Sequence, residues 1–507
     1  MKKIVKYIVE SVVGIMLLTG CEGFLETTSQ DLIVPVTVEH YKELLQGEGY
    51  FKSLLSKSAF VLYMTDDVEF FGRDGVDMIT NANFSSYGDA YCWQEEVEND
   101  HMTDECYKYL YKQVLVANTC ISALNKMEGS SEEREILAGQ AYFTRAFAYF
   151  LLANFYAQAY NEATASDLCV PLVLEPTPTA NKFQRNTIEE VWNRIVMDCD
   201  QAIECLKGKD ITSIYEINYG AALILGMRIG LFMEDFDKVI DCGEKVLALN
   251  DALYNLTGKP QINGPSAPSA SPFIDKFIYP ANNPEIIWLY DNGGAVSFYE
   301  LFNVNIILSA NTISISSVAS NSIMSAYKHQ EGSSEGTLEE DKRVAYWFIP
   351  APSNYYPAYV PMKFDPDNIA GDDYQSAFRT GEVYISLAEA YVRKENPNKD
   401  RALYYLNKLR ENRITHYTNL ETADFLSDDA LLHFVWEERR RELCFEEHHR
   451  WWDLRRTGQP ELTHVWQGGE VYQLTEKDMA YIINFPKSER EYNPDLNNPR
   501  PKRNGIN

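Results

Sequence analysis

The chain has 507 residues, 45% of them hydrophobic, and a formal net charge of -28 at pH 7. A chain of this length can bury a large core, whereas its strong negative charge repels phosphate backbones and anionic lipid headgroups. Nucleic-acid binding and electrostatic attachment to a membrane surface are therefore disfavoured, and a neutral or basic ligand fits the composition better.

The N-terminal segment has the pattern of a lipoprotein signal peptide. Lysines at positions 2, 3 and 6 precede the apolar run 12–18. The last residue of this run begins the sequence Leu18-Thr19-Gly20-Cys21. Small residues suit signal-peptidase cleavage, and the thiol of the next cysteine accepts the lipid. The run is shorter than the roughly 20 apolar residues of a membrane-spanning helix. We therefore expect residues 1–20 to be removed, and 21–507 to form one domain tethered through Cys21.

Aromatic residues crowd the segment 66–95 among acids, amides and an arginine. A sugar ring has an apolar C–H face that packs on an aromatic plane, and neighbouring polar groups bond its hydroxyls. The composition therefore predicts a ligand-binding loop. The alternative is that these rings only pin the loop to the core. The candidate ligand contacts are Trp93, Tyr87, Tyr91, Arg73 and Asn81.

Helical hairpins are the clearest internal pattern. Residues 219–247 predict two helices joined by a short turn, with Gly226 at a close helix contact, and resemble a tetratricopeptide unit. A second unit fits 385–410, and a third is split between 141–157 and 187–206, where Thr187 and Glu190 form a capping box. Helix pairs of this kind stack because neither helix buries its apolar face alone.

We therefore expect a mainly α fold: a tetratricopeptide-like, right-handed superhelix of helix pairs with long loop insertions and a few short strands. The helix-pair scaffold falls at about 100–250 and 375–457, and the loop-rich, ligand-facing insertions at about 60–100 and 250–375. Residues 285–290 predict a strand that places Trp288 in the core. Further candidate ligand contacts in the insertions are Phe298, Tyr299, Tyr355, Tyr356 and Tyr359.

The sequence predicts neither a metal site nor a cofactor. Acids at 365–373 lack the glutamate that a calcium-binding helix-loop-helix requires, because Ser376 stands at that position. His448 and His449 are adjacent, so they point to different faces of a helix. The eight cysteines after Cys21 have no metal-like spacing, and we expect them to be free thiols.

The segment 435–458 combines acids, arginines and aromatics in a predicted helical run. Glutamates and arginines one turn apart favour ion pairs, and arginine suits a buried clamp on a carboxylate. Arg450 or Arg455 holding Asp453 or Glu442 is the predicted clamp. A structural network is the favoured interpretation, ahead of a catalytic carboxylate pair or a metal site.

This segment resembles the signature of the SusD/RagB family, whose pattern continues along the chain. Similar elements occur in order, at 21–26, 145–150, 284–288, 341–343, 379–390, 406–410 and 485–494. Lys487 departs from the pattern, which more often has an apolar residue there. The resemblance implies an outer-membrane lipoprotein, exposed on the cell surface, that captures oligo- or polysaccharide for a SusC-like TonB-dependent transporter, with no catalytic residues.

Two alternatives remain open. A peptide- or protein-binding member of the same family would share every feature except the aromatic loops. An all-α carbohydrate-active hydrolase would need two carboxylates roughly 5–9.5 Å apart across a cleft, and no such pair stands out in the sequence.

Overall fold

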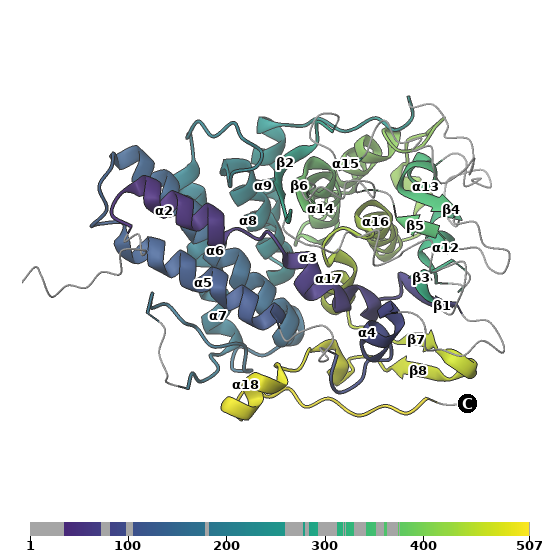
Figure 1. Cartoon of the computed structure of the whole chain (residues 1–507). Coiled ribbons are helices and arrows are strands. Elements are labelled where there is room, and N and C mark those ends of the chain that lie inside the picture. Colours follow the sequence, from purple (N-terminus) through teal and green to yellow (C-terminus); the bar gives the residue numbers. More distant parts are fainter. Residues whose placement is uncertain are drawn as a thin grey trace, which may run out of the picture.

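A stack of helices forms the main body of the protein in the computed structural model (Figure 1). Successive helices contact one another from α5 through α6, α7, α8 and α9 to α14, which in turn packs on α15 and α16. Their bounds are α5 (Glu105–Ala123), α6 (Ser131–Tyr156), α7 (Ile188–Leu206), α8 (Tyr219–Met233), α9 (Phe236–Leu249), α14 (Thr380–Arg393), α15 (Lys399–Glu411) and α16 (Asp428–Leu443). The structure describes residues 35–71, 82–97, 105–177, 182–258, 277–278, 283–292, 312–317, 319, 321–328, 341–350, 359–361, 363, 374 and 376–505. The three predicted helix pairs are α8–α9, α14–α15 and the split pair α6–α7.

Side-chain caps set where these helices begin. The Thr187 hydroxyl accepts a hydrogen bond from the Glu190 amide, and the Glu190 carboxylate accepts one from the Thr187 amide. Ser130 and Glu133 form the same box at the start of α6. Such caps satisfy amides that have no partner inside the helix. The predicted capping box at Thr187 is confirmed.

Small residues allow the helices to approach closely. A Cβ on Gly226 of α8 would lie 3.1 Å from the Cys242 Sγ of α9. A Cβ on Gly243 of α9 would lie 2.8 Å from the side chain of Leu387 of α14. The predicted close contact at Gly226 is confirmed.

The core is built around α6 and a short strand. Among the described residues, α6 is the one helix long and apolar enough to cross a membrane, but 89% of its apolar window is buried inside the protein. Trp288 is fully buried, and its ring packs edge-on against Phe143 and Phe378 at 5.1 Å between centroids. Trp288 is a core residue, as predicted.

Within the described ranges, four antiparallel strand pairs supplement the helices. They are β1 (Val68–Phe71) with β3 (Thr312–Ile315), β2 (Ile286–Tyr290) with β6 (Ser376–Arg379), β4 (Phe348–Pro350) with β5 (Tyr359–Pro361), and β7 (Leu462–Val465) with β8 (Val471–Leu474). The pair β2–β6 sits against the helix stack and places Trp288 opposite Phe378.

The other three strand pairs gather at one end of the molecule, together with α4 (Ala82–Tyr91), α12 (Ile323–Lys328) and α13 (Lys342–Trp347) (Figure 1). We call these elements the loop-bearing end. They come from the predicted insertions and from the C-terminal segment, whereas α2 (Val38–Leu44), α3 (Leu54–Ser58) and α18 (Lys487–Tyr492) lie elsewhere on the stack.

The C-terminal signature segment differs from the prediction. It forms α16, a turn, and a separate α17 (His449–Arg456), so the expectation of one continuous helical run was wrong. Phe445 and Glu447 take positive φ angles of 57° and 47°, which an α-helix of L-residues does not tolerate. The turn brings the carboxylates of Glu446 and Glu447 to buried arginines.

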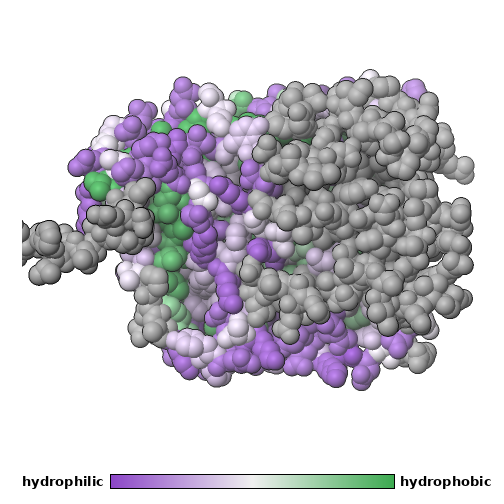
Figure 2. Space-filling view, viewed as in Figure 1, coloured by the Kyte–Doolittle hydropathy of each residue, from purple (hydrophilic) through white to green (hydrophobic). Residues whose placement is uncertain are grey.

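The described surface is mainly hydrophilic on the face shown in Figure 2, in keeping with the acidic composition. The eight described cysteines form no disulfide with one another. Two of them, Cys199 of α7 and Cys242 of α9, are buried thiols on helix faces.

Candidate functional site

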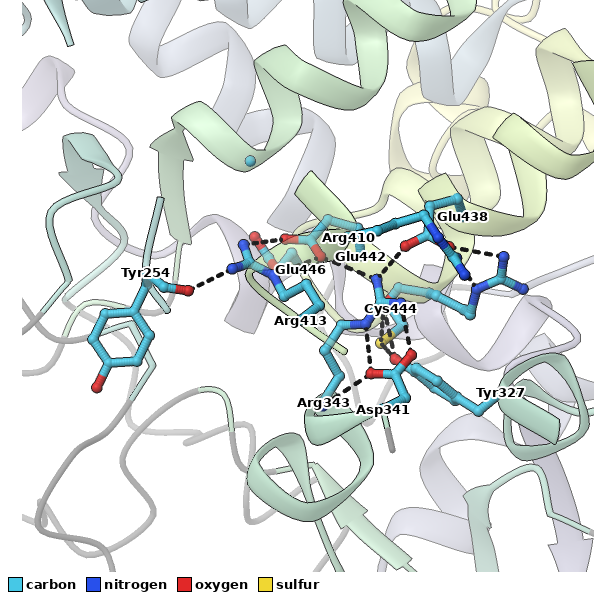
Figure 3. A network of polar contacts seen from close by, with 12 residues as sticks. Tyr254, Tyr327, Asp341, Arg343, Arg410, Arg413, Glu438, Glu442, Cys444 and Glu446 are labelled. Atoms are coloured by element: carbon cyan, nitrogen blue, oxygen red, sulfur yellow. Dashed lines mark hydrogen bonds and ion pairs between the residues drawn. The ribbon is translucent and has the colours of Figure 1, made fainter. Parts of the chain in front are cut away.

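A buried network of arginines and carboxylates lies at the centre of the signature segment (Figure 3). Glu442 accepts hydrogen bonds from Arg379 Nη1 at 2.7 Å and Arg413 Nη2 at 2.9 Å, and these side chains are fully buried. Burial alone raises the pKa of Glu442, but the charges of Arg413 and Arg379 outweigh it and hold that pKa below its usual range. We call this network, together with the separate buried cluster of Arg228, Glu382 and Glu447, the ionic centre. Its members are Arg228, Glu285, Asp341, Arg343, Lys363, Arg379, Glu382, Arg410, Arg413, Glu438, Arg441, Glu442, Glu446 and Glu447.

Each arginine in this centre joins separate elements. Arg228 of α8 binds Glu382 of α14 at 2.7 Å and Glu447 of the turn at 2.8 Å. Arg379 at the end of β6 binds Glu285 at 2.9 Å and Glu446 at 2.7 Å. A buried charge left without its partner is costly, so the centre fixes the helix stack, β2–β6 and the turn in one arrangement. It is a structural network, as favoured from the sequence.

The structure contains buried arginine–carboxylate clamps, as predicted, but the partners differ from the predicted ones. Asp453 is held by Arg439 at 2.9 Å and by Arg456 at 2.8 Å. Arg455 instead donates to the carbonyl oxygens of Asn154 and Ala157 at the end of α6. Many arginines and acids lie within reach on this segment, and only the folded geometry selects among them.

Neither adjacent histidine is part of a ligand cluster. His448 Nε2 lies 2.7 Å from the Ser58 hydroxyl, and burial lowers the pKa of His448 to about 3. His449 is also buried, and its ring packs edge-on against Trp452. Within the described ranges, no group of three or more histidine, cysteine or acidic side chains is placed to hold a metal ion.

The signature segment also holds the base of the loop-bearing end. Arg440 of α16 donates to Asp67 Oδ1 at 2.8 Å and to the Asn321 carbonyl oxygen at 2.9 Å. Arg450 of α17 grips both oxygens of Asp66, at 2.7 and 2.8 Å. Asp66 and Asp67 immediately precede β1, so these ion pairs fix the point from which β1 extends.

The three candidate aromatics of segment 66–95 that the structure describes point inward. Trp93 is fully buried, and its Nε1 donates to the Met64 carbonyl oxygen at 2.9 Å. Tyr91 is 1% exposed, and its hydroxyl donates to the Val465 carbonyl oxygen at 3.1 Å. Tyr87 is 9% exposed and stacks on Tyr63. The prediction of these rings as open stacking surfaces is corrected.

The physical reason is a histidine on the C-terminal hairpin. His464 of β7 lies between the rings of Tyr91 and Trp93, parallel to both and 4.1 Å from each centroid. Its two ring nitrogens face the carbonyl oxygens of Tyr91 at 2.7 Å and Thr65 at 3.1 Å. The rings therefore pin the segment to the hairpin, which is the alternative that the sequence left open.

Of the remaining candidates, only Tyr359 lies in the described part of the chain, on β5, where it is half-buried against the core. The other candidates lie outside the described residues: Cys21, Arg73, Asn81, Phe298, Tyr299, Tyr355 and Tyr356.

A different aromatic pair is partly open at the loop-bearing end. Trp466, in the turn between β7 and β8, and Phe70 of β1 are both half-buried, with ring centroids 5.2 Å apart. A Cβ on Gly88 would lie 3.0 Å from the Trp466 ring, so the indole rests directly on α4. Sequence reasoning missed Trp466, although a tryptophan just before Gly468-Gly469 in a hairpin turn was an available signal.

A groove of about 440 Å³ runs between α12 and α16 at the same end. Arg440 lines this groove and also holds Asp67 at the base of β1. Hydroxyl, amide, imidazole and charged groups can bond a polar ligand there. The lining residues are Asn321, Ser322, Ser325, Ala326, Ala430, His433, Phe434, Glu437, Arg440 and Arg441.

These features define a class of protein: a tetratricopeptide-like helix scaffold that carries a polar, aromatic end built from insertions. Residues 38–223 match a family model described as "Starch-binding associating with outer membrane", and residues 325–501 match the model of the SusD family. The chain belongs to the SusD/RagB family. That family description also supports an association with the outer membrane.

Relatives and solved structures agree over nearly the whole length. SusD-like protein P2 of Formosa agariphila is 23% identical over 97% of this chain and 99% of its own. A SusD superfamily structure from Bacteroides fragilis has a TM-score of 0.66 at 21% identity, covering 91% of this chain and 99% of its own. A SusD-like carbohydrate binding protein from Bacteroides vulgatus has a TM-score of 0.65 at 18% identity, covering 92% and 98%. The predicted fold class is confirmed.

Proposed function

We propose that the protein is a non-catalytic, cell-surface lipoprotein that captures oligo- or polysaccharide at the loop-bearing end. We further propose that it delivers the glycan to a SusC-like TonB-dependent outer-membrane transporter, and that a lipid on Cys21 tethers it. The observation that carries the proposal is the partly open Phe70–Trp466 pair at the same end as the polar α12–α16 groove. An aromatic plane and adjacent hydrogen-bonding groups are the two elements that sugar recognition needs.

The state of two buried glutamates, Glu438 and Glu442, supports binding without hydrolysis. A glycosidase keeps one carboxylic acid protonated across a cleft from a second carboxylate. For Glu438 and Glu442 in the ionic centre the opposite holds, because guanidinium groups surround both carboxylates. Burial raises the pKa of Glu438, but Arg343, Arg410 and Arg441 outweigh it and hold that pKa well below its ordinary value.

Binding of purified, lipid-free protein (residues 22–507) to immobilised neutral polysaccharides tests the proposal. We expect Trp466→Ala to weaken binding about tenfold, since one aromatic stacking contact contributes roughly 1–1.5 kcal/mol. Tyr492→Ala is the matched control, because Tyr492 is 52% exposed and lies on α18, away from the loop-bearing end (Figure 1). The control should bind like the unchanged protein.

Two results would overturn the proposal. One is retention of no plant, host or microbial polysaccharide, especially if a peptide is bound instead. The other is release of shorter sugars by the purified protein. Delivery is tested separately, by co-purification of the lipidated protein with a TonB-dependent transporter from its native membrane.

A further inference from the structure

A second hollow lies on the helix stack itself. Its volume is about 610 Å³, and it lies between α15 and the segment 419–423. Figure 1 shows α15 at the top of the molecule and the β7–β8 hairpin at the lower right, so this hollow is remote from Trp466. We call it the α15 groove. Its lining residues are Asp400, Leu403, Tyr404, Asn407, Lys408, Glu411, Asn419, Leu420, Glu421, Thr422 and Ala423.

The wall of the α15 groove is fixed before any ligand arrives. The Asn407 amide donates to the Leu420 carbonyl oxygen at 3.0 Å and accepts from the Leu420 amide at 2.9 Å. Tyr417 also donates to Asn407 Oδ1, at 2.5 Å. The side-chain amide of Asn407 thus bonds both backbone groups of Leu420, as a neighbouring strand would, and holds segment 419–423 against α15. A preformed wall lowers the ordering cost of binding.

One aromatic ring is held open at the groove. Tyr404 is 46% exposed. The guanidinium of Arg401 lies over its ring at 4.9 Å from the centroid, and Tyr405 packs edge-on at 5.2 Å. These contacts restrain the ring, while Leu403 and Leu420 are buried beneath the groove. A braced, exposed tyrosine above an apolar floor suits the C–H face of a sugar ring.

The polar rim selects by charge. Lys408 Nζ and Glu411 Oε1 are 2.8 Å apart, with side chains that are 44% and 42% exposed. Asp400 and Glu421 add two further carboxylates to the lining, and Asn419 an amide. Carboxylates outnumber the lysine, and the whole chain has a net charge of -28. The rim can bond hydroxyl or amino groups and repels carboxylate or sulfate groups.

We propose that the α15 groove is a second glycan subsite, which takes one or two rings of a neutral or amino sugar through Tyr404. The ligand class rests on the proposed function, whereas the location does not. A polysaccharide bound at both sites would gain avidity from its length. Acidic polysaccharides should not occupy the groove.

Hydrogen-exchange mass spectrometry with maltoheptaose, cellohexaose, xylohexaose and chitohexaose tests this subsite. At least one of them should slow exchange in residues 399–423, in the unchanged protein and in Trp466→Ala alike. Tyr404→Ala should abolish that protection and weaken binding at this site about tenfold. Tyr404→Phe keeps the ring and should restore it, Tyr492→Ala should change nothing, and thermal unfolding checks that each variant is folded.

The outcomes separate the two proposals. Protection at the loop-bearing end with none at 399–423 overturns the subsite and leaves the proposed function standing. Protection at 399–423 that survives Tyr404→Ala also overturns the subsite. If no glycan protects any part of the chain, both fail. If polygalacturonate protects 399–423 as strongly as neutral sugars do, the charge argument is wrong.

Discussion

The ionic centre and the loop-bearing end use polar and aromatic residues in opposite ways. In the ionic centre, acids close together in the sequence of α16 and its turn meet arginines from α8, α13, β6 and α15 and from the segment after α15. These contacts are buried and charge-matched. At the loop-bearing end, aromatic residues from distant segments meet, and Trp93 is buried while Trp466 is partly open. The family signature therefore encodes how the scaffold is held together, whereas Trp466, the ring on which the proposed function depends, lies outside it.

Breaking the ionic centre should give the largest effect. Glu442→Gln leaves Arg379 and Arg413 facing a neutral amide in a fully buried site. We expect a loss of about 3–5 kcal/mol in the free energy of unfolding, measured by urea denaturation. The control is Glu411→Gln, which removes an exposed pair with Lys408 and should cost under about 1 kcal/mol. Equal losses in the two variants would show that the centre is not what holds the stack.

Asp291, which follows the last residue of β2, should make the stability of the protein depend on pH. It accepts a hydrogen bond from the Leu55 amide at 2.7 Å, and burial raises the pKa of Asp291 to about 7. Between about pH 4, the ordinary pKa of an aspartic acid, and about pH 7, the Asp291 carboxyl is protonated in the folded state but ionised in the unfolded state. The contribution of Asp291 to stability therefore falls as pH rises through this window, by up to about 4 kcal/mol.

Asp291→Asn should remove the part of the pH dependence of unfolding that Asp291 causes. Unfolding free energies at pH 5 and pH 8 should differ less in the variant than in the unchanged protein. An unchanged difference would mean that Asp291 is ionised in the folded state at both pH values. Glu389 provides the contrast: burial raises its pKa, but Arg456 and Arg393 outweigh that and lower it to about 2, so its contribution is lost only in acid.

A smaller loss of stability is expected when a methyl group is added to the ionic centre than when a charge is removed from it. A Cβ on Gly381 would collide with the Arg379 guanidinium and the Glu285 carboxylate. Gly381→Ala should cost about 1–3 kcal/mol in thermal unfolding. Gly47→Ala is the control, since nothing beyond its own helix and its chain neighbours lies within 4 Å of its Cβ position. Similar losses at both glycines would argue against tight packing around Arg379.

The smallest effect should come from the loop-bearing end. His464→Phe keeps a flat ring between Tyr91 and Trp93 but removes the contacts with the carbonyl oxygens of Tyr91 and Thr65. We expect a cost of about 1–2 kcal/mol, with faster amide exchange in 62–71 and 87–97 and little change in the helix stack. Uniformly faster exchange throughout the protein would show that the two regions unfold as one.

The sequence carries enough local information to predict the scaffold but not the site. The helix pairs follow from apolar periodicity, and Thr187 and Glu190 mark a helix start that the structure confirms. The orientation of Tyr87, Tyr91 and Trp93 depends on Tyr63, Met64 and His464, and no local pattern shows whether a loop ring meets such partners. The same limit explains why Trp466 was missed and why Asp453 was paired with the wrong arginine.

The pair between Asp67 and Arg440 has a consequence for how the chain folds. Its partners are 373 positions apart, and closing so long a loop is slow because its entropy cost precedes the contacts that repay it. The ion pair that holds the base of β1 can therefore form only after α16 has been synthesised, whereas the partner strand β3 comes earlier in the chain. Folding of the loop-bearing end is therefore a late step. A shortened chain that lacks α16 should leave the base of β1 without the Asp67–Arg440 ion pair.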